Sequence, residues 1–506
     1  MDLRAAEREL KDAAGRSGSE NDQGAGAWRV HPSTVWSVLN DVSDDAAFVF
    51  LFGSSAGEMT ARQASRALAQ LITSIDDAIN DAVFEITSHE RFTALEGRWR
   101  GLRWLADTAG LARPADRPKL KILNASWGTI NRDVDDHDDL FQTATFNLLY
   151  NEEFGRAGGE PYGLIVSDHH FSHRPSGAQD DIGTLRALAQ IASVSFCPIA
   201  VGGSPSLFGI DHMGELDRRE DIPASFDSVE YQSLRQLRND PSSRFLAFLA
   251  GSALMRDRFG ERAARDMGTQ YRDRLPNDPS RLAWAPAAFS LAHVTIRAII
   301  NYNWPAAING AVSHRYGGPA TVDPEGGVLT GLPNFTFHNG GAGDWQKIPV
   351  EVYLSRTQEA QLNALGFIAP RPCAYTQYAA LHACPSAYAS EGRAEISKVG
   401  AFLPNIMSVS RFAHAIKVIA RSWVGSLEGP QELQQVLQGW LSKYRRSTMP
   451  RDSDNDVAPL RDFRVKIDPI PNRPGAFTCN VKLQPHFQID YVISEFELST
   501  EIKKAV

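Results

Sequence analysis

The sequence predicts a mixed α/β fold, with a helical arm near the N-terminus and a β-rich C-terminus. Residues 59–110 keep the apolar spacing of helices. Strand, helix and strand patterns follow one another between residues 118 and 201, an order typical of a parallel sheet. Residues 463–498 alternate between apolar and polar side chains, as in a half-buried sheet. We therefore expect central mixed β-sheets flanked by helices, with the helical arm in addition.

The composition limits the classes of function. The 506 residues allow about two to four domains of ~100–200 residues each. A formal net charge of −8 disfavours general binding of nucleic acid, which needs concentrated Lys and Arg. The charged N-terminus has no signal core, and no apolar window approaches the ~20 residues that span a bilayer. We expect a soluble, cytoplasmic protein with no membrane insertion. The four cysteines form no C-x-x-C pair, which favours reduced, mostly buried thiols.

The helical arm carries an apolar stripe on its second helix. Spacings of three and four residues place the apolar side chains of this helix on one face. The stripe consists of Phe92, Leu95, Trp99, Leu102 and Leu105. A two-helix arm cannot bury such a stripe alone. It needs a partner, either elsewhere in this chain or in another chain.

A short helix is predicted ahead of the arm, at residues 2–14. Leu3, Ala6 and Leu10 are spaced for one face of it. Residues 15–27 are rich in Gly, Ser and Asn and are typical of a flexible linker. A helix on such a tether is suited to binding by another protein.

The middle of the chain alternates between strand and helix patterns. We expect strands at 119–124, 162–166 and 195–201, with a helix at 182–192 between the last two. We expect mostly helix at 228–312, loops or a small insertion at 313–345, a strand at 349–354 and a helix at 356–365.

The C-terminal part begins with two helices and ends in strands. The helices are predicted at 401–424 and 430–444. Apolar alternation then runs from Phe463 and resumes after Pro485 with Phe487, Ile489 and Tyr491. A sheet edge at the end of a chain is available for pairing with a strand of another chain.

Motifs for catalysis are weak. No P-loop, H-E-x-x-H or G-x-S-x-G string occurs. Residues 168–173 (DHHFSH) could bind a metal, although a polar loop at the sheet edge is the interpretation we favour. Residues 135–139 (DDHDD) fit a solvated acidic loop better than a cation site. Adjacent Glu152 and Glu153 diverge in direction. We expect no catalytic, metal or cofactor-binding residues.

Four strings resemble one protein family, the large sheath subunit of the type VI secretion system (TssC or VipB type). The strings match the family in their residues, in their order along the chain and in the spacing between them. They are HERFTALEGRWRGLRWL (89–105), LLYNEEFGRAGGEPYGLIVSDHHFSH (148–173), LPNIMSVSRFAHAIKVIAR (403–421) and PHFQIDYVISEFELST (485–500). Three stretches depart from the pattern, which indicates a divergent branch: 252–260, 384–386 and the segment after Arg235, which lacks an acidic pair.

The resemblance implies a contractile tail-sheath fold and a mechanical function. Large subunits of this family pair with a small sheath subunit (TssB or VipA type) and stack into a helical sheath on a baseplate. Contraction of the sheath drives an inner tube outward, and an AAA+ ATPase disassembles the contracted form. We expect Phe92, Leu95, Trp99 and Leu102 to contact the small subunit. Phe487, Ile489 and Tyr491 would join an inter-subunit strand ladder, and Leu3, Ala6 and Leu10 would be recognised by the ATPase.

The expected domains follow from this plan. Residues 1–30 are the tethered helix and linker, and 31–115 the arm that pairs with the small subunit. Residues 116–400 form the middle α/β domain with the insertion near 313–345, and 401–506 the inner domain. Two other functions stay open, which are a phage-like tail sheath or baseplate component and a metal-dependent α/β enzyme using Asp168, His169, His170 and His173. The seven proposed interface residues could also simply fill this chain's own core.

Overall fold

The computed structural model describes most of the chain beyond residue 59. The described residues are 60–156, 158–175, 180–257, 281–305, 307–310, 312–313, 323–324, 326–338, 345–373, 376–389, 400–423, 430–445, 460–469, 476–485 and 496–503. The predicted helix with Leu3, Ala6 and Leu10, and the ladder residues Phe487, Ile489 and Tyr491, lie outside them. The chain divides into two compact units, one of residues 1–86 with 259–273 and one of the remaining residues.

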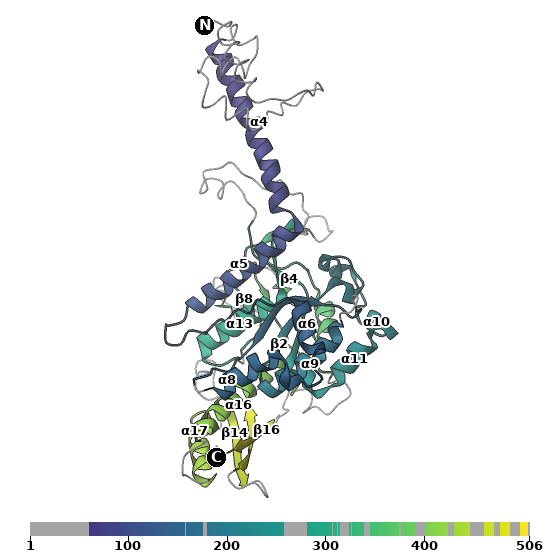
Figure 1. Ribbon diagram of the computed structural model, residues 1–506. Helices are drawn as coiled ribbons and strands as arrows, with labels where there is room; N and C mark the ends of the chain where they lie inside the picture. Colours follow the sequence, from purple (N-terminus) through teal and green to yellow (C-terminus); the bar gives the residue numbers. More distant parts are fainter. Residues whose placement is uncertain are drawn as a thin grey trace. The chain divides into compact units, whose positions relative to one another are not determined.

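The described part of the first unit is helix α4 (Ala61–Thr87), which confirms the first helix of the arm (Figure 1). At its start Gln63 Oε1 accepts from the backbone N–H of Thr60 (2.9 Å) and Thr60 Oγ1 accepts from the backbone N–H of Gln63 (3.4 Å), which is a reciprocal cap. None of the described side chains of α4 is buried. Its exposed apolar side chains follow helical spacing on one stripe, and they are Ile72, Ile75, Ile79 and Ile86.

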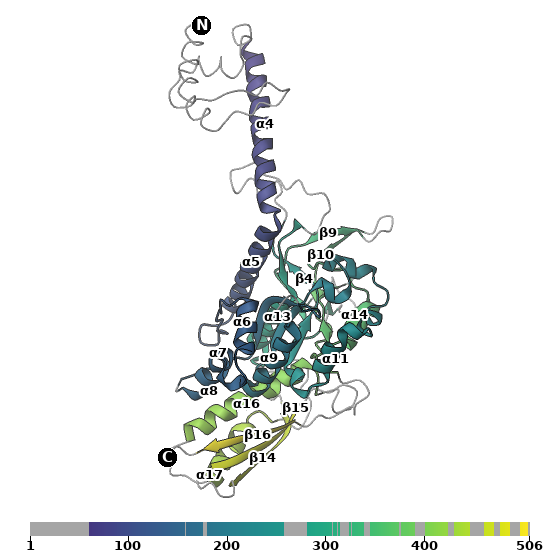
Figure 2. The same cartoon turned by 45° about the vertical axis from the view of Figure 1, so that its right-hand side comes forward.

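A four-stranded parallel sheet forms the centre of the second unit (Figures 1 and 2). Its strands are β1 (Ile165–Phe171), β2 (Ile199–Gly203), β3 (Leu246–Leu249) and β11 (Phe367–Ile368), in that order. Helix α9 (Asp181–Ser195) connects β1 to β2. The predicted strand–helix–strand unit is therefore confirmed, although β1 begins three residues later than the strand predicted at 162.

Side chains that alternate along the sheet enter two different cores. Ile199 and Val201 of β2 face one core, to which α9, α11 (Gln232–Asn239) and α14 (Arg356–Ala364) contribute. Ala200, between them, enters the second core together with α13 (Ala287–Tyr302). The sheet is thus covered by helices on both faces, as buried parallel strands require.

Two sequence-based expectations for the middle of the chain are wrong. Residues 119–124 form no strand, because no other described segment pairs with their backbone groups. The expectation of mostly helix at 228–312 is confirmed for the described residues of this range, which also contain β3, β4 (Ser252–Leu254) and β5 (Trp284–Pro286). The strand predicted at 349–354 lies earlier, as β10 (Trp345–Ile348), and only a single bridge joins Val350 to Ala253.

Short strands and helices complete the second unit. The helix predicted at 356–365 is confirmed as α14, and the described residues between 313 and 345 include the short strands β7 (Asp323–Pro324), β8 (Val328–Leu329) and β9 (Phe335–His338). The remaining strands are β6 (Val312–Ser313), β12 (Arg371–Pro372) and β13 (Ala379–Ala380). The short helices are α6 (Trp127–Asp135), η2 (Leu140–Gln142), α7 (Ala144–Phe146), η3 (Asn147–Asn151), α8 (Glu152–Gly155), η4 (Pro205–Phe208), η5 (Met213–Arg218), α10 (Pro223–Phe226), η6 (Val229–Tyr231) and η7 (Pro241–Phe245).

The C-terminal module agrees with the sequence prediction. Helices α16 (Leu403–Trp423) and α17 (Pro430–Ser442) pack with an antiparallel sheet (Figure 2). The strands lie in the order β14 (Leu460–Pro469), β15 (Ala476–Pro485) and β16 (Phe496–Lys503). The four cysteines of the chain are free and buried, as expected.

Candidate assembly surfaces

Helix α5 (Glu90–Gly110) is the element that carries the predicted interface, and glycines fix its position. Gly97 and Gly101 face β5 and α13. A β-carbon at Gly97 would lie 2.0 Å from the carbonyl oxygen of Trp284, and one at Gly101 2.4 Å from the ring of Phe289. Only glycine permits so close an approach at these two positions. This side of α5 therefore faces the body of the protein.

A buried histidine joins the same helix to α13. The rings of Trp104 and His293 stack with centroids 4.1 Å apart and planes 15° apart. His293 Nδ1 lies 3.0 Å from Thr108 Oγ1, and the Trp104 indole donates to the carbonyl of Thr330 at 2.9 Å. Burial lowers the pKa of His293 to about 3, with a further contribution from Arg297. The imidazole is therefore neutral at physiological pH and acts as a packing and hydrogen-bonding group.

A buried ion pair also fixes α5. Glu96 Oε2 accepts from Arg256 Nε at 3.1 Å, and the Arg256 side chain is 5% exposed. The other oxygen of Glu96 accepts from Arg100 at 2.8 Å, where the arginine side chain is 46% exposed. One carboxylate thus joins α5 to the segment after β4 and also pairs along the helix surface. Together with the glycines and Trp104, this pair defines one orientation of α5 about its own axis.

That orientation leaves most of the predicted stripe exposed. Phe92 is 40% exposed, Leu95 53% and Trp99 63%. Leu102 is half-buried against the cluster that Phe289 and Ile296 form, and Leu105 is buried in that cluster. The predicted five-residue stripe is therefore divided. Its first three members face solvent, whereas its last two serve the core of this chain.

The C-terminal sheet offers a second candidate surface. Within the described residues, β15 is hydrogen-bonded on both sides, while β14 and β16 each have only one neighbouring strand in the sheet. A bridge between Arg445 and Leu460 occupies one end of β14. Two edges of this kind can each accept a further strand. The predicted ladder residues Phe487, Ile489 and Tyr491 lie outside the described residues.

Helix α16 makes a polar junction with α9 that sequence reasoning missed. His414 is 2% exposed, and its Nε2 lies 3.1 Å from the carbonyl oxygen of Ser195. Burial lowers the pKa of His414 to about 4, so the ring is neutral. Lys417 donates to the carbonyl of Val194 at 3.2 Å. Both side chains thus satisfy carbonyls at the C-terminal end of α9, a position that favours positive charge.

Aromatic rings surround the ammonium group of Lys417. Its Nζ lies 4.8 Å from the ring centroids of Tyr150 and Phe154 and 4.7 Å from that of Phe196. Phe196 holds a left-handed backbone conformation, with φ of 51°. One turn later Arg421 donates to the carbonyl of Phe154 at 3.0 Å. The string RFAHAIKVIAR therefore joins the C-terminal module to the sheet domain.

Glu153 organises the turn of the YNEEFG string. Its Oε1 accepts from Lys121 Nζ at 2.6 Å, and its Oε2 accepts from the backbone N–H of Glu160 at 2.8 Å. Burial acts to raise the pKa of this carboxyl, but these hydrogen bonds lower it below its ordinary value. Gly159 closes the turn, since a β-carbon there would lie 2.1 Å from the Glu153 carbonyl oxygen. The carboxylate is thus engaged in holding the chain, and neighbouring Glu152 points to Arg156 instead.

The histidine cluster at 168–173 does not converge on one point. Among the described residues, no three His, Cys, Asp or Glu side chains gather as ligands for a metal ion. Asp139, in the acidic loop, accepts from the N–H of Phe141 and caps η2. Each of the four candidate ligands has a different neighbour. Asp168 pairs with Arg98, and His169 hydrogen-bonds to the carbonyl of Ala125. The ring of His170 lies beside Gly202, and that of His173 stacks on Tyr231.

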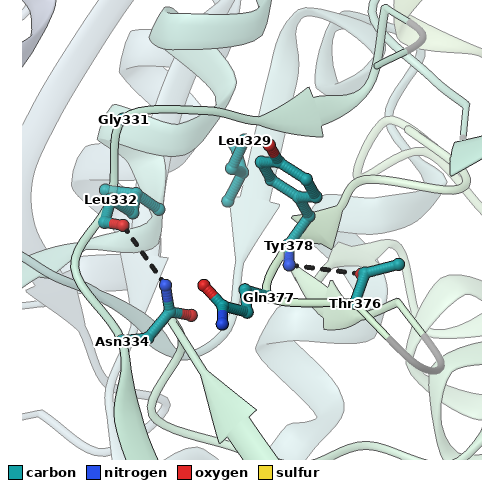
Figure 3. A pocket seen from close by; sticks show the side chains of 7 residues that line it. All are labelled: Leu329, Gly331, Leu332, Asn334, Thr376, Gln377 and Tyr378. Carbon is teal, nitrogen blue, oxygen red and sulfur yellow. Dashed lines mark hydrogen bonds between the residues drawn. The ribbon is translucent and has the colours of Figure 1, made fainter. Parts of the chain in front are cut away.

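A pocket of about 380 Å³ lies beside β8 and β13 (Figure 3). The Asn334 amide donates to the carbonyl of Leu332 at 3.5 Å, and the Tyr378 N–H donates to Thr376 Oγ1 at 3.2 Å. Its lining consists of Leu329, Gly331, Leu332, Asn334, Thr376, Gln377 and Tyr378. These seven residues supply no carboxylate, imidazole or thiol, so the pocket lends no support to the metal-enzyme alternative.

None of the helices described here is long and apolar enough to cross a membrane.

Comparison with known proteins defines the class as that of tail-sheath proteins. The chain belongs to the VipB family (EvpB/VC_A0108): residues 69–388 match the model of its tail sheath N-terminal domain, and residues 393–502 match that of its tail sheath gpW/gp25-like domain. The chain is therefore a structural sheath subunit with a tail-sheath fold, as the resemblance implied.

A curated relative and two solved structures are similar to the chain. The "Type VI secretion system sheath protein TssC1" of Pseudomonas aeruginosa is 27% identical over 457 residues, which is 88% of each chain. A sheath tail protein from Desulfitobacterium hafniense has a TM-score of 0.29 and 9% identity, over 65% of this chain and 61% of that one. The contracted helical sheath of the anti-feeding prophage has a TM-score of 0.34 and 8% identity, over 74% of this chain and 82% of that one.

Proposed function

We propose that this chain is the large subunit of a type VI secretion contractile sheath. It polymerises with a small sheath subunit around an inner tube, on a baseplate in the cytoplasm, and contraction of the polymer propels the tube. An AAA+ ATPase that binds the predicted helix with Leu3, Ala6 and Leu10 disassembles the contracted form. The chain needs no catalytic residue of its own, because the work comes from rearrangement of subunit contacts.

The observation that carries this proposal is the exposed stripe on a fixed helix. Phe92, Leu95 and Trp99 face solvent although α5 is held by Gly97 and by the buried Glu96–Arg256 pair. A helix that already has its own packing face has no internal use for a second apolar face. Contiguous exposed apolar side chains of this kind are typical of a protein interface. We assign the stripe to the small subunit, with Leu102 at its edge, and the ladder of Phe487, Ile489 and Tyr491 to neighbouring copies.

The proposed domains are those expected from the sequence, at 1–30, 31–115, 116–400 and 401–506. The two family models meet between residues 388 and 393, which supports a boundary near the start of α16.

Co-expression with a small sheath subunit, followed by electron microscopy, tests the proposal. The wild-type pair is expected to form tubules. Leu95→Ser with Trp99→Ser is expected to abolish tubules and copurification while the melting temperature of the isolated chain stays unchanged. Val229→Ser is the matched control, because Val229 is 81% exposed but lies outside the arm. Tubules of normal yield from the double variant would contradict the assignment.

A further inference from the structure

Residues 118–124 follow α5, and their backbone groups have no backbone partner among the described residues. In the part of the chain that the structure describes, no backbone hydrogen bond joins any N–H or C=O group of this segment to another backbone group. Leu120 is 46% exposed, Ile122 70% and Leu123 62%. Exposed apolar side chains beside unpaired backbone groups are the features of a free β-edge.

Side chains nevertheless hold the segment in place. Lys119 Nζ donates to Glu160 at 2.5 Å, and Lys121 Nζ donates to Glu153 at 2.6 Å and to the hydroxyl of Tyr162 at 3.2 Å. The lysines thus engage the neighbouring loop, while Leu120 and Ile122, which alternate with them, face solvent. This alternation has the period of two of an extended strand. The segment is an ordered template and has no need to fold before a partner binds.

The far end of the segment is fixed as well. The carbonyl of Ala125 lies 3.1 Å from His169 Nε2 of β1, and Ser126 caps α6 by accepting from the N–H of Thr129. Two lysines and one carbonyl therefore secure both halves of the segment. Since Lys119 and Lys121 already have carboxylate partners, the open face is apolar and not basic. The complementary partner is an extended strand with alternating apolar side chains.

The exposed apolar side chains near this segment in the sequence indicate which partner covers residues 118–124. Fifteen large apolar side chains are exposed among the described residues, and eleven of them lie between Ile72 and Leu123. They include Phe92, Leu95 and Trp99 on α5, and α5 itself ends at Gly110, eight residues before Pro118. Three side chains alone are too few for an independent interface, since each partner of a stable complex buries about 800 Å². The occupant must therefore be a chain that the α5 stripe already binds.

We propose that residues 118–124 accept a β-strand of the same small sheath subunit that covers the α5 stripe. The strand pairs with the free backbone groups of this segment, and its apolar side chains cover Leu120 and Ile122. This inference rests on the proposed function, because it takes the partner from there. It adds a second contact of a different kind, in which main-chain hydrogen bonds supplement apolar helix packing.

Amide hydrogen exchange tests the inference on the intact chain, alone and in complex with the co-expressed small subunit. In the complex, exchange at residues 119–124 is expected to slow by about tenfold or more, together with protection of α5. Leu120→Ser with Ile122→Ser is expected to reduce copurification about tenfold at an unchanged melting temperature, since both side chains are exposed. Ile122→Pro, which removes one backbone donor, is expected to weaken the complex as well, and Val229→Ser is again the control.

Three results would overturn the inference. A complex that protects α5 but leaves 119–124 unprotected would refute strand pairing and leave the proposed function intact. Protection of 119–124 in the isolated chain at high concentration would assign the segment to a second copy of this chain. Failure of the small subunit to bind at all would refute both proposals.

Discussion

The indole of Trp104 stacks on the imidazole of His293 at a centroid distance of 4.1 Å, and this contact joins α5 to α13. Five residues earlier on the same helix, Trp99 is 63% exposed. The two tryptophans therefore have opposite surroundings. One fixes the helix on the protein, and the other belongs to the face that the proposed partner covers.

Trp104→Ala is expected to destabilise the isolated chain, whereas Trp99→Ala is not. Loss of the stacked ring and of its hydrogen bond to Thr330 should cost about 3 kcal/mol of unfolding free energy. Replacement of the exposed ring should change it by no more than about 0.5 kcal/mol. Urea denaturation of both variants measures the difference. Equal losses would show that Trp99 also packs within its own chain.

Gly97→Ala and Gly110→Ala form a second matched pair. Alanine generally stabilises a helix by about 1 kcal/mol over glycine. At Gly97 the new methyl group would lie 2.0 Å from the Trp284 carbonyl oxygen, so α5 must shift, and we expect a net loss of about 2 kcal/mol. At Gly110 nothing lies within 4 Å of the added carbon. Calorimetry should therefore show a lower melting temperature for Gly97→Ala alone, and an unchanged one would mean that α5 is not seated by its glycines.

Glu96 allows a buried and an exposed ion pair to be compared on one carboxylate. Arg256→Ala leaves the carboxylate without its buried partner and should cost about 3 kcal/mol. Arg100→Ala removes the surface partner and should cost about 0.5 kcal/mol or less. Urea denaturation in low and high salt would check both values. A strong salt dependence of the Arg256 effect would argue against burial of this pair.

The two buried histidines make stability depend on pH. Imidazoles of the unfolded chain bind protons near pH 6.5, whereas in the folded chain burial lowers the pKa of His293 to about 3 and that of His414 to about 4. Between these values the unfolded state binds more protons, so stability falls as the pH falls below about 6.5. Each group contributes up to about 1.4 kcal/mol per pH unit.

Urea denaturation between pH 7.5 and 5 measures this slope. His414→Gln is expected to reduce it relative to the wild type, because the substituted side chain no longer binds a proton in the unfolded state. His293→Gln should act in the same direction. Identical slopes in all three proteins would mean that these imidazoles titrate alike in the folded and unfolded chain.

Much of the secondary structure could be predicted because its patterns are long. The apolar spacing of α16 and the alternation of β14 and β15 extend over many residues, so one period dominates each. The strands β3 to β5 have three or four residues, and no period can be recognised over that length. Residues 119–124 have a strand pattern but no strand, because a ladder needs a neighbour that the described chain does not supply.

The candidate interface could be predicted only in part. The pattern placed Phe92, Leu95, Trp99, Leu102 and Leu105 together, since all are apolar and helically spaced. It could not show that glycine defines the packing face of α5, because glycine adds nothing to an apolar stripe. The repeat of Gly97 and Gly101 at a spacing of four was the available signal. The contacts of His414 and Lys417 depend on residues more than 200 positions away, which no local pattern contains.

Helix α16 has a consequence for how load passes through a polymer of this chain. Its first turns, with Leu403 and Met407, lie in a core of the parallel sheet, and its later turns, with Phe412 and Ile416, lie in the core of the C-terminal module. One continuous rod therefore spans both halves, with no loop between them at which bending could absorb a pull. A force applied to the strands of the C-terminal module would be transmitted to the parallel sheet through this one helix, so the module and the sheet would turn together.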